Sequence, residues 1–287
     1  MLLAWEQVGG SCAVIKMRFD FEQVVFSGGG IRCFWHGGFL SVAGDVLQLA
    51  PQRISGVSGG VLSGAAWVAG RENRLLDVMG EAFKRNDENF DADKSNFTPH
   101  QEMYRQVVSD TLDGDAVDAI CEGPDFQAML AVPPQWLPPR FFVLLSGSAY
   151  GAEKKLRSRP HLKWARRIGL QPLRVDVREA AREGKLVDLI CAAATIPPVF
   201  DVPEWEGLRV LDGGMIDKAP PPEPDEGRTL FLMTTRYRNL PQTGRCLYLQ
   251  PSAEVAADKI DFSDRTKLDR TWRQGALDGT AWVKENG

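Results

Sequence analysis

The sequence predicts an α/β protein with a three-layer α/β/α architecture, in which a mostly parallel sheet lies between two layers of helices. A β-branched run at residues 22–26 precedes a glycine-rich turn and then a segment, 34–49, with helical spacing of its apolar residues. A second short strand at 53–56 leads into a helix rich in small residues that reaches about residue 69. This alternation of strand and helix is typical of parallel sheets covered by helices.

Later segments extend the same pattern. We expect further strands in four segments: "RFFVLLSGS" from Arg140, "LRVLDGG" from Leu208, "TLFLMTT" from Thr229 and "CLYLQ" from Cys246. Near the end of the chain, apolar and small residues recur every three or four positions, at Leu268, Trp272, Ala276, Gly279 and Val283. This stripe predicts a C-terminal helix that packs on the core.

The chain of 287 residues, 44% of them hydrophobic, is long enough for one large domain, which we place at residues 22–287. Residues 1–21 are interpreted as an N-terminal extension. The polar segment 85–100 predicts a surface loop, and we interpret 85–135 as a cap region over the sheet edge. The proline-rich run at 219–227 predicts a surface turn.

Composition argues against several classes of protein. The net charge of −4, from 34 basic and 38 acidic residues, gives no general attraction for nucleic acid. The five cysteines are scattered without a C-x-x-C pair, which argues against a disulfide framework and a zinc site. The N-terminal residues lack the basic region of a signal peptide, and the uncharged stretch 54–70 is too short for a membrane span. We therefore expect a soluble, cytoplasmic protein.

The pentapeptide Gly56-Val57-Ser58-Gly59-Gly60 matches the pattern G-x-S-x-G of hydrolase nucleophiles. It follows a predicted strand and precedes a predicted helix, as that motif requires. In such a sharp turn the small glycines leave the serine hydroxyl accessible at the end of the sheet. Ser58 is therefore the candidate nucleophile.

A nucleophilic serine needs a base, and the histidines offer a poor one. In α/β-hydrolases the histidine follows the acid near the end of the chain, but the last of the three histidines here, His161, lies 126 residues before the end. The predicted strand from Leu208 instead ends in Asp212, Gly213 and Gly214, where active sites of α/β sheets form. Asp212 is the candidate base, although an aspartate before glycine is also common in turns.

Three motifs, SGGGIRC at residues 27–33, GVSGG at 56–60 and DGG at 212–214, stand in one order, and "AAATIPPVFDVP" begins at Ala192. Together they resemble the patatin-like phospholipase family over residues 22–250. The resemblance implies a patatin-like fold and a Ser-Asp dyad that cleaves acyl esters of lipids without metal or cofactor. Ser58 would be the nucleophile and Asp212 the general base.

By the same resemblance, the glycine-rich loop after the first strand would form the oxyanion hole. The residues it implies are Gly28, Gly29 and Gly30, with Arg32 beside them, and the motif glycines Gly56, Gly60, Gly213 and Gly214 would shape the turns. This chain departs from the family pattern at Ser27, Cys33 and Lys218, which stand where the family has aspartate, glycine and asparagine. Neither nucleophile nor base is affected.

The substrate implied is an acyl lipid, and phospholipase A or lysophospholipase chemistry on a phospholipid is expected. The basic segment 153–167 and Trp136 favour a transient, peripheral contact with a membrane surface, although a solvated surface explains the charges equally well.

The sequence leaves two alternative functions open. The first is a catalytically silent lipid-binding or interaction module on the same fold. The second is a histidine-dependent esterase that uses His36, His100 or His161. Dinucleotide binding is disfavoured because Cys33 occupies the place of the third glycine in G-x-G-x-x-G.

Overall fold

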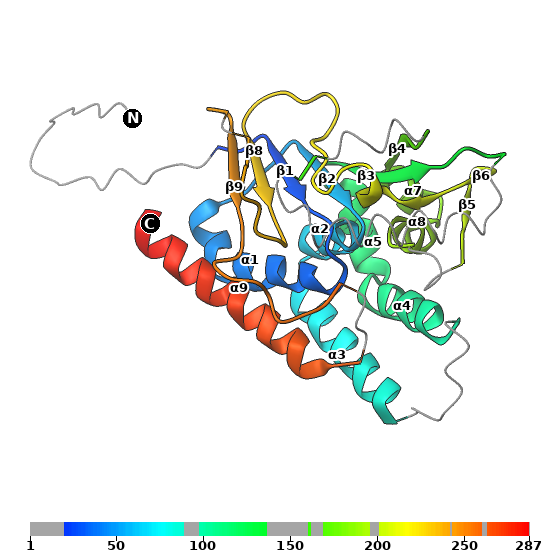
Figure 1. The fold of residues 1–287 in the computed structure, drawn as a ribbon, viewed down its shortest axis with the longest axis horizontal. Helices are drawn as coiled ribbons and strands as arrows, with labels where there is room; N and C mark the ends of the chain where they lie inside the picture. The colour runs from blue at the N-terminus through cyan, green and yellow to red at the C-terminus, as the bar shows by residue number, and fades with distance from the viewer. Residues whose placement is uncertain are drawn as a thin grey trace, which may run out of the picture.

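A seven-stranded mixed sheet lies at the centre of the computed structural model (Figure 1). The structure describes residues 20–88, 98–136, 160–161, 169–195, 201–241, 243–259 and 263–286. Five parallel strands form most of the sheet: β1 (Gln23–Phe26), β2 (Arg53–Val57), β3 (Asp125–Val132), β8 (Thr229–Leu232) and β9 (Cys246–Leu249). The order along the sheet is β4-β3-β2-β1-β8-β9, and β4 (Gln171–Asp176) and β7 (Leu211–Asp212) pair antiparallel with β3.

Helices flank this sheet. Their bounds are α1 (Phe34–Leu47), α2 (Gly59–Val68), α3 (Glu72–Glu88), α4 (Thr98–Thr111), α5 (Gly114–Glu122), α7 (Val177–Arg182), α8 (Leu186–Ala193) and α9 (Arg265–Asn286). Alternate residues of β1 face different clusters: Val24 and Phe26 join the large core with the helices, whereas Val25 packs with Ala219 and Phe231. The mostly parallel sheet with flanking helices confirms the predicted three-layer class.

The first two strand–helix units agree closely with the sequence patterns. The predicted strands at 22–26 and 53–56 are β1 and β2, and the helices that follow them are α1 and α2. Because β1 and β2 are parallel neighbours, with Phe26 beside Gly56, the segments that follow them emerge at the same edge of the sheet. This edge carries the glycine-rich loop and the G-x-S-x-G turn.

Other elements differ from the sequence predictions. The prediction of a single strand from Leu208 is wrong. Strand β6 (Leu208–Arg209) pairs with β5 (Glu204–Trp205) in a separate hairpin, whereas β7 pairs with β3 in the main sheet. The chain changes sheets at Val210, whose N–H donates to the Pro203 carbonyl. The strand expected from Arg140 lies outside the described residues, and β3 and β4 were not predicted.

Both ends of the segment 85–100, which its polarity predicts as a loop, are helical. Helix α3 continues to Glu88 and α4 begins at Thr98, while 89–97 lie outside the described residues. The range 85–135 also contains α5 and β3, and β3 lies beside β2 within the sheet. The polarity predicts a loop here because a helix with one solvated side needs few apolar residues, so its sequence looks like that of a loop.

The C-terminal helix α9 packs closely against α1, as the apolar stripe predicts. Its fully or nearly buried positions are Leu268, Thr271, Gly275 and Gly279, so the buried face is offset slightly from the predicted stripe. A Cβ at Gly38 would lie 2.0 Å from the Trp272 carbonyl oxygen, and one at Gly275 would lie 2.4 Å from the Trp35 carbonyl oxygen. Glycine at these positions lets the two backbones approach directly.

Replacement of Gly38 by alanine is expected to lower the free energy of unfolding by about 1–3 kcal/mol, because the backbone of α9 must move away. Gly44→Ala, in the same helix, is the matched control. A Cβ there meets nothing within 4 Å, so alanine should stabilise the helix by about 0.5–1 kcal/mol. Urea unfolding of both variants tests the prediction, and equal effects would contradict it.

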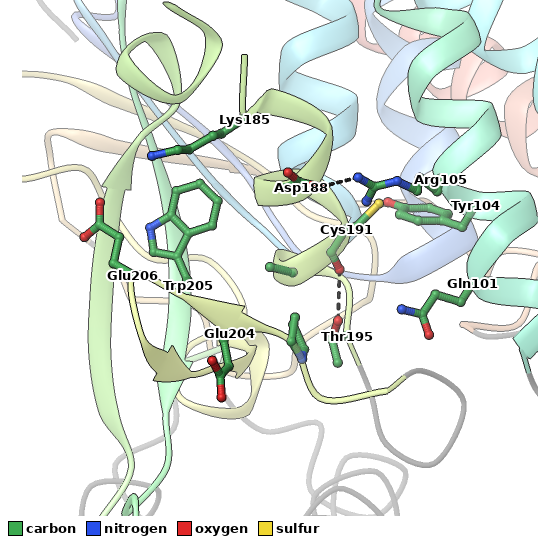
Figure 2. A pocket seen from close by; sticks show the side chains of 12 residues that line it. Gln101, Tyr104, Arg105, Lys185, Asp188, Cys191, Thr195, Glu204, Trp205 and Glu206 are labelled. Carbon is green, nitrogen blue, oxygen red and sulfur yellow. Dashed lines mark hydrogen bonds and ion pairs between the residues drawn. The ribbon is translucent and has the colours of Figure 1, made fainter. Parts of the chain in front are cut away.

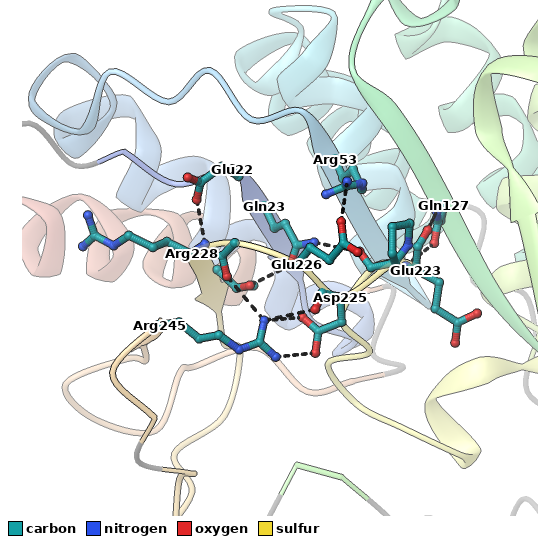
Figure 3. Close-up of polar contacts among 12 residues, drawn as sticks. Glu22, Gln23, Arg53, Gln127, Glu223, Asp225, Glu226, Arg228 and Arg245 are labelled. Atoms are coloured by element: carbon teal, nitrogen blue, oxygen red, sulfur yellow. Dashed lines mark hydrogen bonds and ion pairs between the residues drawn. The ribbon is translucent and has the colours of Figure 1, made fainter.

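The proline-rich segment closes the opposite, amino-terminal end of the parallel strands (Figure 3). The Gln23 side chain donates to the Pro224 carbonyl at 2.9 Å, and the Glu223 N–H donates to the Gln127 side-chain oxygen at 2.9 Å. Asp225 pairs with Arg245 at 2.7 Å. These contacts tie β1, β3 and β9 together at this end and leave the carboxyl ends of the strands for other functions.

Candidate active site

Ser58 occupies a strained turn between β2 and α2. Its backbone angles are φ 55° and ψ −139°, a region that residues other than glycine rarely adopt. Strand β2 ends at Val57 and α2 begins at Gly59, so the serine lies at the helix N-terminus. A strained residue held between two regular elements has its side chain fixed in direction, as a nucleophile requires.

The motif glycines permit this turn because other backbone segments lie against them. A Cβ at Gly60 would lie 2.3 Å from the Phe26 carbonyl oxygen, and one at Gly56 would lie 2.9 Å from the Val61 Cα. Any larger residue would therefore push α2 away from β1 or from its own strand. The pattern around Ser58 thus reflects close packing of backbone as well as turn geometry.

Asp212 reaches the same edge from the short strand β7. Leu130 of β3 pairs with Asp212, and the preceding residue of β3, Met129, pairs with Val57 of β2. Strand β3 thereby places the aspartate next to the end of β2. The carboxylate is held by its own turn, because the Gly214 N–H donates to Oδ1 at 2.7 Å.

The two predicted residues meet. The Ser58 hydroxyl donates to Asp212 Oδ2 at 2.8 Å, and both residues are almost completely buried, with 2% and 1% exposure. The contact joins positions 154 apart in the chain. A carboxylate at this distance is placed to accept the hydroxyl proton.

The glycine-rich loop runs directly alongside this pair. A Cβ at Gly28 would lie 3.1 Å from the Ser58 Cβ, and Gly30 has a positive φ of 57°. The Thr234 hydroxyl donates to the Gly28 carbonyl at 2.7 Å, and the Arg32 guanidinium donates to the Thr235 hydroxyl at 3.3 Å. The segment after β8 therefore fixes the loop in place.

The amide of the first loop glycine and the amide of the residue after the third are engaged within the protein. The Gly28 N–H donates to the Lys218 carbonyl at 2.8 Å, and the Ile31 N–H donates to the Lys259 carbonyl at 3.3 Å. Of the predicted oxyanion donors, Gly28 therefore has its amide directed to another acceptor, which leaves the Gly29 and Gly30 amides as candidates.

Comparison with protein families identifies the family of this chain. A family model described as patatin-like phospholipase matches residues 24–224, well over half of the chain. The chain belongs to the patatin-like phospholipase family. Comparison with curated proteins gives no significant match. Membership of this family indicates lipid hydrolase activity in general, with lipids as substrates.

In this patatin-like chain, the residues that depart from the family pattern have structural partners. The Ser27 hydroxyl accepts the Thr234 N–H at 3.0 Å, and the Cys33 thiol donates to the Ser27 carbonyl at 3.5 Å. Burial raises the pKa of the Cys33 thiol above its usual value, so the thiol stays neutral. Lys218 is buried and its backbone carbonyl accepts the Gly28 amide. The Ser27 and Cys33 side chains thus help to hold the loop, whereas Lys218 holds it through its backbone.

The patatin-like site contains one charged residue that the sequence did not reveal. Lys259 Nζ lies 3.7 Å from Asp212 Oδ2, and the side chains are only 6% and 1% exposed. The chain after β9 folds back over the glycine-rich loop, and a Cβ at Gly30 would lie 1.9 Å from the Lys259 carbonyl oxygen. No motif marks this lysine, because its position depends entirely on the tertiary fold.

A narrow apolar pocket adjoins Ser58. Its volume is about 30 Å³, and its apolar walls include Ile31, Phe34, Leu62, Leu75 and Met79.

A larger pocket of about 350 Å³ lies between α4, α8 and β5, where Arg105 pairs with Asp188 beside Cys191 and Trp205 (Figure 2). Tyr104 lines both pockets. Thr195, also in the larger pocket, accepts the Asp212 backbone N–H at 3.0 Å.

His36 and His161 have other partners in this patatin-like chain. His36 is fully buried in α1, where its Nε2 lies 3.0 Å from the Leu232 carbonyl oxygen. Burial lowers the pKa of His36 to about 3, so its ring is neutral at ordinary pH. His161 Nδ1 lies 2.8 Å from Asp217 Oδ2. Ser58 instead bonds to Asp212, which argues against the histidine-dependent esterase.

Of the two features that favour membrane contact, Trp136 and the basic segment 153–167, the described residues include the first and only a small part of the second. Trp136 is 81% exposed, which makes its side chain available to a lipid surface. The basic segment 153–167 lies outside the described residues apart from Pro160 and His161. No helix in the ranges that the structure describes is both long and apolar enough to cross a membrane.

Proposed function

We propose that this protein is a serine acyl hydrolase that cleaves ester bonds of lipids through a Ser58–Asp212 dyad. The observation that carries the proposal is the 2.8 Å hydrogen bond from the Ser58 hydroxyl to the buried Asp212 carboxylate. Family membership supports lipid hydrolysis in general. The strained turn at Ser58 and the adjoining glycine-rich loop support the finer assignment.

In the proposed reaction, the Ser58 oxygen attacks the ester carbonyl carbon while its proton passes to Asp212 Oδ2. The carbonyl electron pair moves onto oxygen, where the amides of Gly29 and Gly30 stabilise it. The carbon–oxygen bond to the alcohol then breaks, and Asp212 returns the proton to the leaving alkoxide. Water attacks the acyl-enzyme with Asp212 again as base, which releases the acid and restores Ser58.

The pocket beside Ser58 suits the acyl part of such a substrate, because its walls are apolar. Its volume of about 30 Å³ is about the share of one water molecule in the liquid, so it admits little more than the methyl end of a short acyl group. A long chain requires Leu75 or Met79 to move aside. We therefore expect nitrophenyl esters of short acids to be cleaved faster than those of long acids when both are dissolved as monomers.

A substrate panel tests the proposal. It contains nitrophenyl esters of increasing chain length and phospholipid vesicles with and without anionic lipid, since peripheral membrane contact is part of the proposal. Wild-type protein should release free acid, and Ser58→Ala protein prepared in parallel should not. Equal rates for the two proteins would overturn the proposal. Vesicle binding without turnover by the wild type would instead favour the silent lipid-binding module.

A further inference from the structure

We propose that Lys259 is a positioning residue of the dyad, whose ammonium keeps Asp212 ionised beside Ser58 and then serves as counter-charge to the oxyanion. This inference rests on the proposed function of Ser58 and Asp212. Three observations carry it: the 3.7 Å separation of Lys259 Nζ and Asp212 Oδ2, the burial of both side chains, and the place of Lys259 in the wall of the Ser58 pocket.

The oxygen next to Lys259 is also the oxygen that accepts the Ser58 hydroxyl. A carboxylate removed from water strongly favours its neutral, protonated form unless a positive charge lies nearby. A protonated Asp212 could not accept the serine proton. The ammonium of Lys259 therefore favours the form of Asp212 that the reaction requires.

Charge balance through the reaction gives Lys259 a second role. Before attack, the ammonium and the Asp212 carboxylate together carry no net charge. When the proton moves from Ser58 to Asp212, the negative charge leaves the carboxylate and appears on the substrate oxygen beside Gly30. Lys259 also lies beside Gly30, so its positive charge faces the negative charge both before and after the proton moves.

Two other buried groups near Asp212 carry no charge. Cys33 and Tyr104 both interact with the Asp212 charge, and burial raises the pKa of each above its usual value, which keeps both neutral. The second buried lysine nearby, Lys218, lies toward the other carboxylate oxygen: its Nζ is 3.6 Å, and Asp212 Oδ1 is 3.0 Å, from the place that a Cβ would take at Gly214. Within the described part of the chain, Lys259 is the cation in ion-pair contact with Asp212.

The pH profile of kcat/KM tests the inference, with Lys259→Met as the main variant. Loss of the cation should lower kcat/KM at pH 7 by about 10- to 100-fold. It should also move the acidic limb of the profile to higher pH, by about 1–3 pH units. Activity should recover as the pH rises, because Asp212 then loses its proton. Lys259→Arg, which keeps the charge, should return the limb toward the wild-type position.

Lys267→Met is the matched control. Lys267 Nζ also lies 3.7 Å from a carboxylate, that of Asp258, but this pair is well exposed, at 36% and 64%. The same substitution there should leave the profile unchanged. A folded Lys259→Met protein with the wild-type pH profile would overturn the inference, as would a limb that Lys259→Arg fails to restore.

A second measurement does not depend on turnover. Urea unfolding of wild type, Lys259→Met, Asp212→Asn and the double variant forms a cycle that isolates the interaction of the two side chains. The inference predicts that the two substitutions are non-additive, and additive effects would overturn it. If the wild type hydrolyses nothing while the cycle shows coupling, the proposed function fails but the charge pair stands.

Discussion

Removal of either member of the dyad is expected to lower kcat/KM for ester hydrolysis by about 10³-fold or more, because Ser58 carries the acyl group and every step moves a proton to or from Asp212. Ser58→Ala removes the nucleophile, and Asp212→Asn replaces the base by a neutral group of the same shape. Since the two residues act as one unit, the double variant should be no slower than the slower single variant. Steady-state rates of the three proteins test this expectation.

Asp217→Asn is the control for the aspartate substitution. Asp217 lies five positions further along, accepts the Ala219 N–H at 2.9 Å and pairs with His161. Loss of its charge should leave hydrolysis within a few-fold of wild type. The dyad would be contradicted if Asp217→Asn were inactive and Asp212→Asn retained most of the activity, because His161 and its aspartate would then be the working pair.

Gly30→Ala is expected to lower kcat by about 10²–10³-fold with a smaller change in KM, as for loss of an oxyanion donor. A Cβ at this position would lie 1.9 Å from the Lys259 carbonyl oxygen, and the φ of 57° is strained for alanine. The loop must shift to relieve the contact. The amide that should meet the transition-state oxygen then moves away from it.

Gly70→Ala separates backbone strain from the loss of the loop geometry. Gly70 has a similar φ of 63°, but nothing lies within 4 Å of the Cβ position. Alanine there should cost about 1–2 kcal/mol of stability and leave kcat unchanged. Thermal melting confirms that each variant is folded. A folded Gly30→Ala protein with wild-type kcat would show that the loop does not stabilise the oxyanion.

The sequence predicted the dyad because both residues stand in short motifs with local physical reasons. The strand–turn–helix context of Ser58 and the glycines after Asp212 can be recognised from neighbouring residues alone. The contact between the two also requires β3, whose Leu130 and Met129 align β7 with β2. That strand was missed, so the sequence singled out both residues without the element that brings them together.

Lys259 could not be predicted for a different reason. It stands in a polar stretch without periodicity, and a lone lysine there is most often solvated. Its burial results from the chain after β9 folding back over the glycine-rich loop, where its carbonyl accepts the Ile31 amide. The end of α3 and the start of α4 were misassigned because local polarity does not distinguish a loop from the solvated side of a helix.

Labelling with a fluorophosphonate, which reacts with activated serines, tests the central claim most directly. Mass spectrometry of the wild-type protein should find one adduct on Ser58. Ser58→Ala should carry no adduct, and Asp212→Asn should be labelled much more slowly, because its hydroxyl has lost the base. An unlabelled wild-type protein, an adduct on another residue, or equally fast labelling of Asp212→Asn would contradict the account.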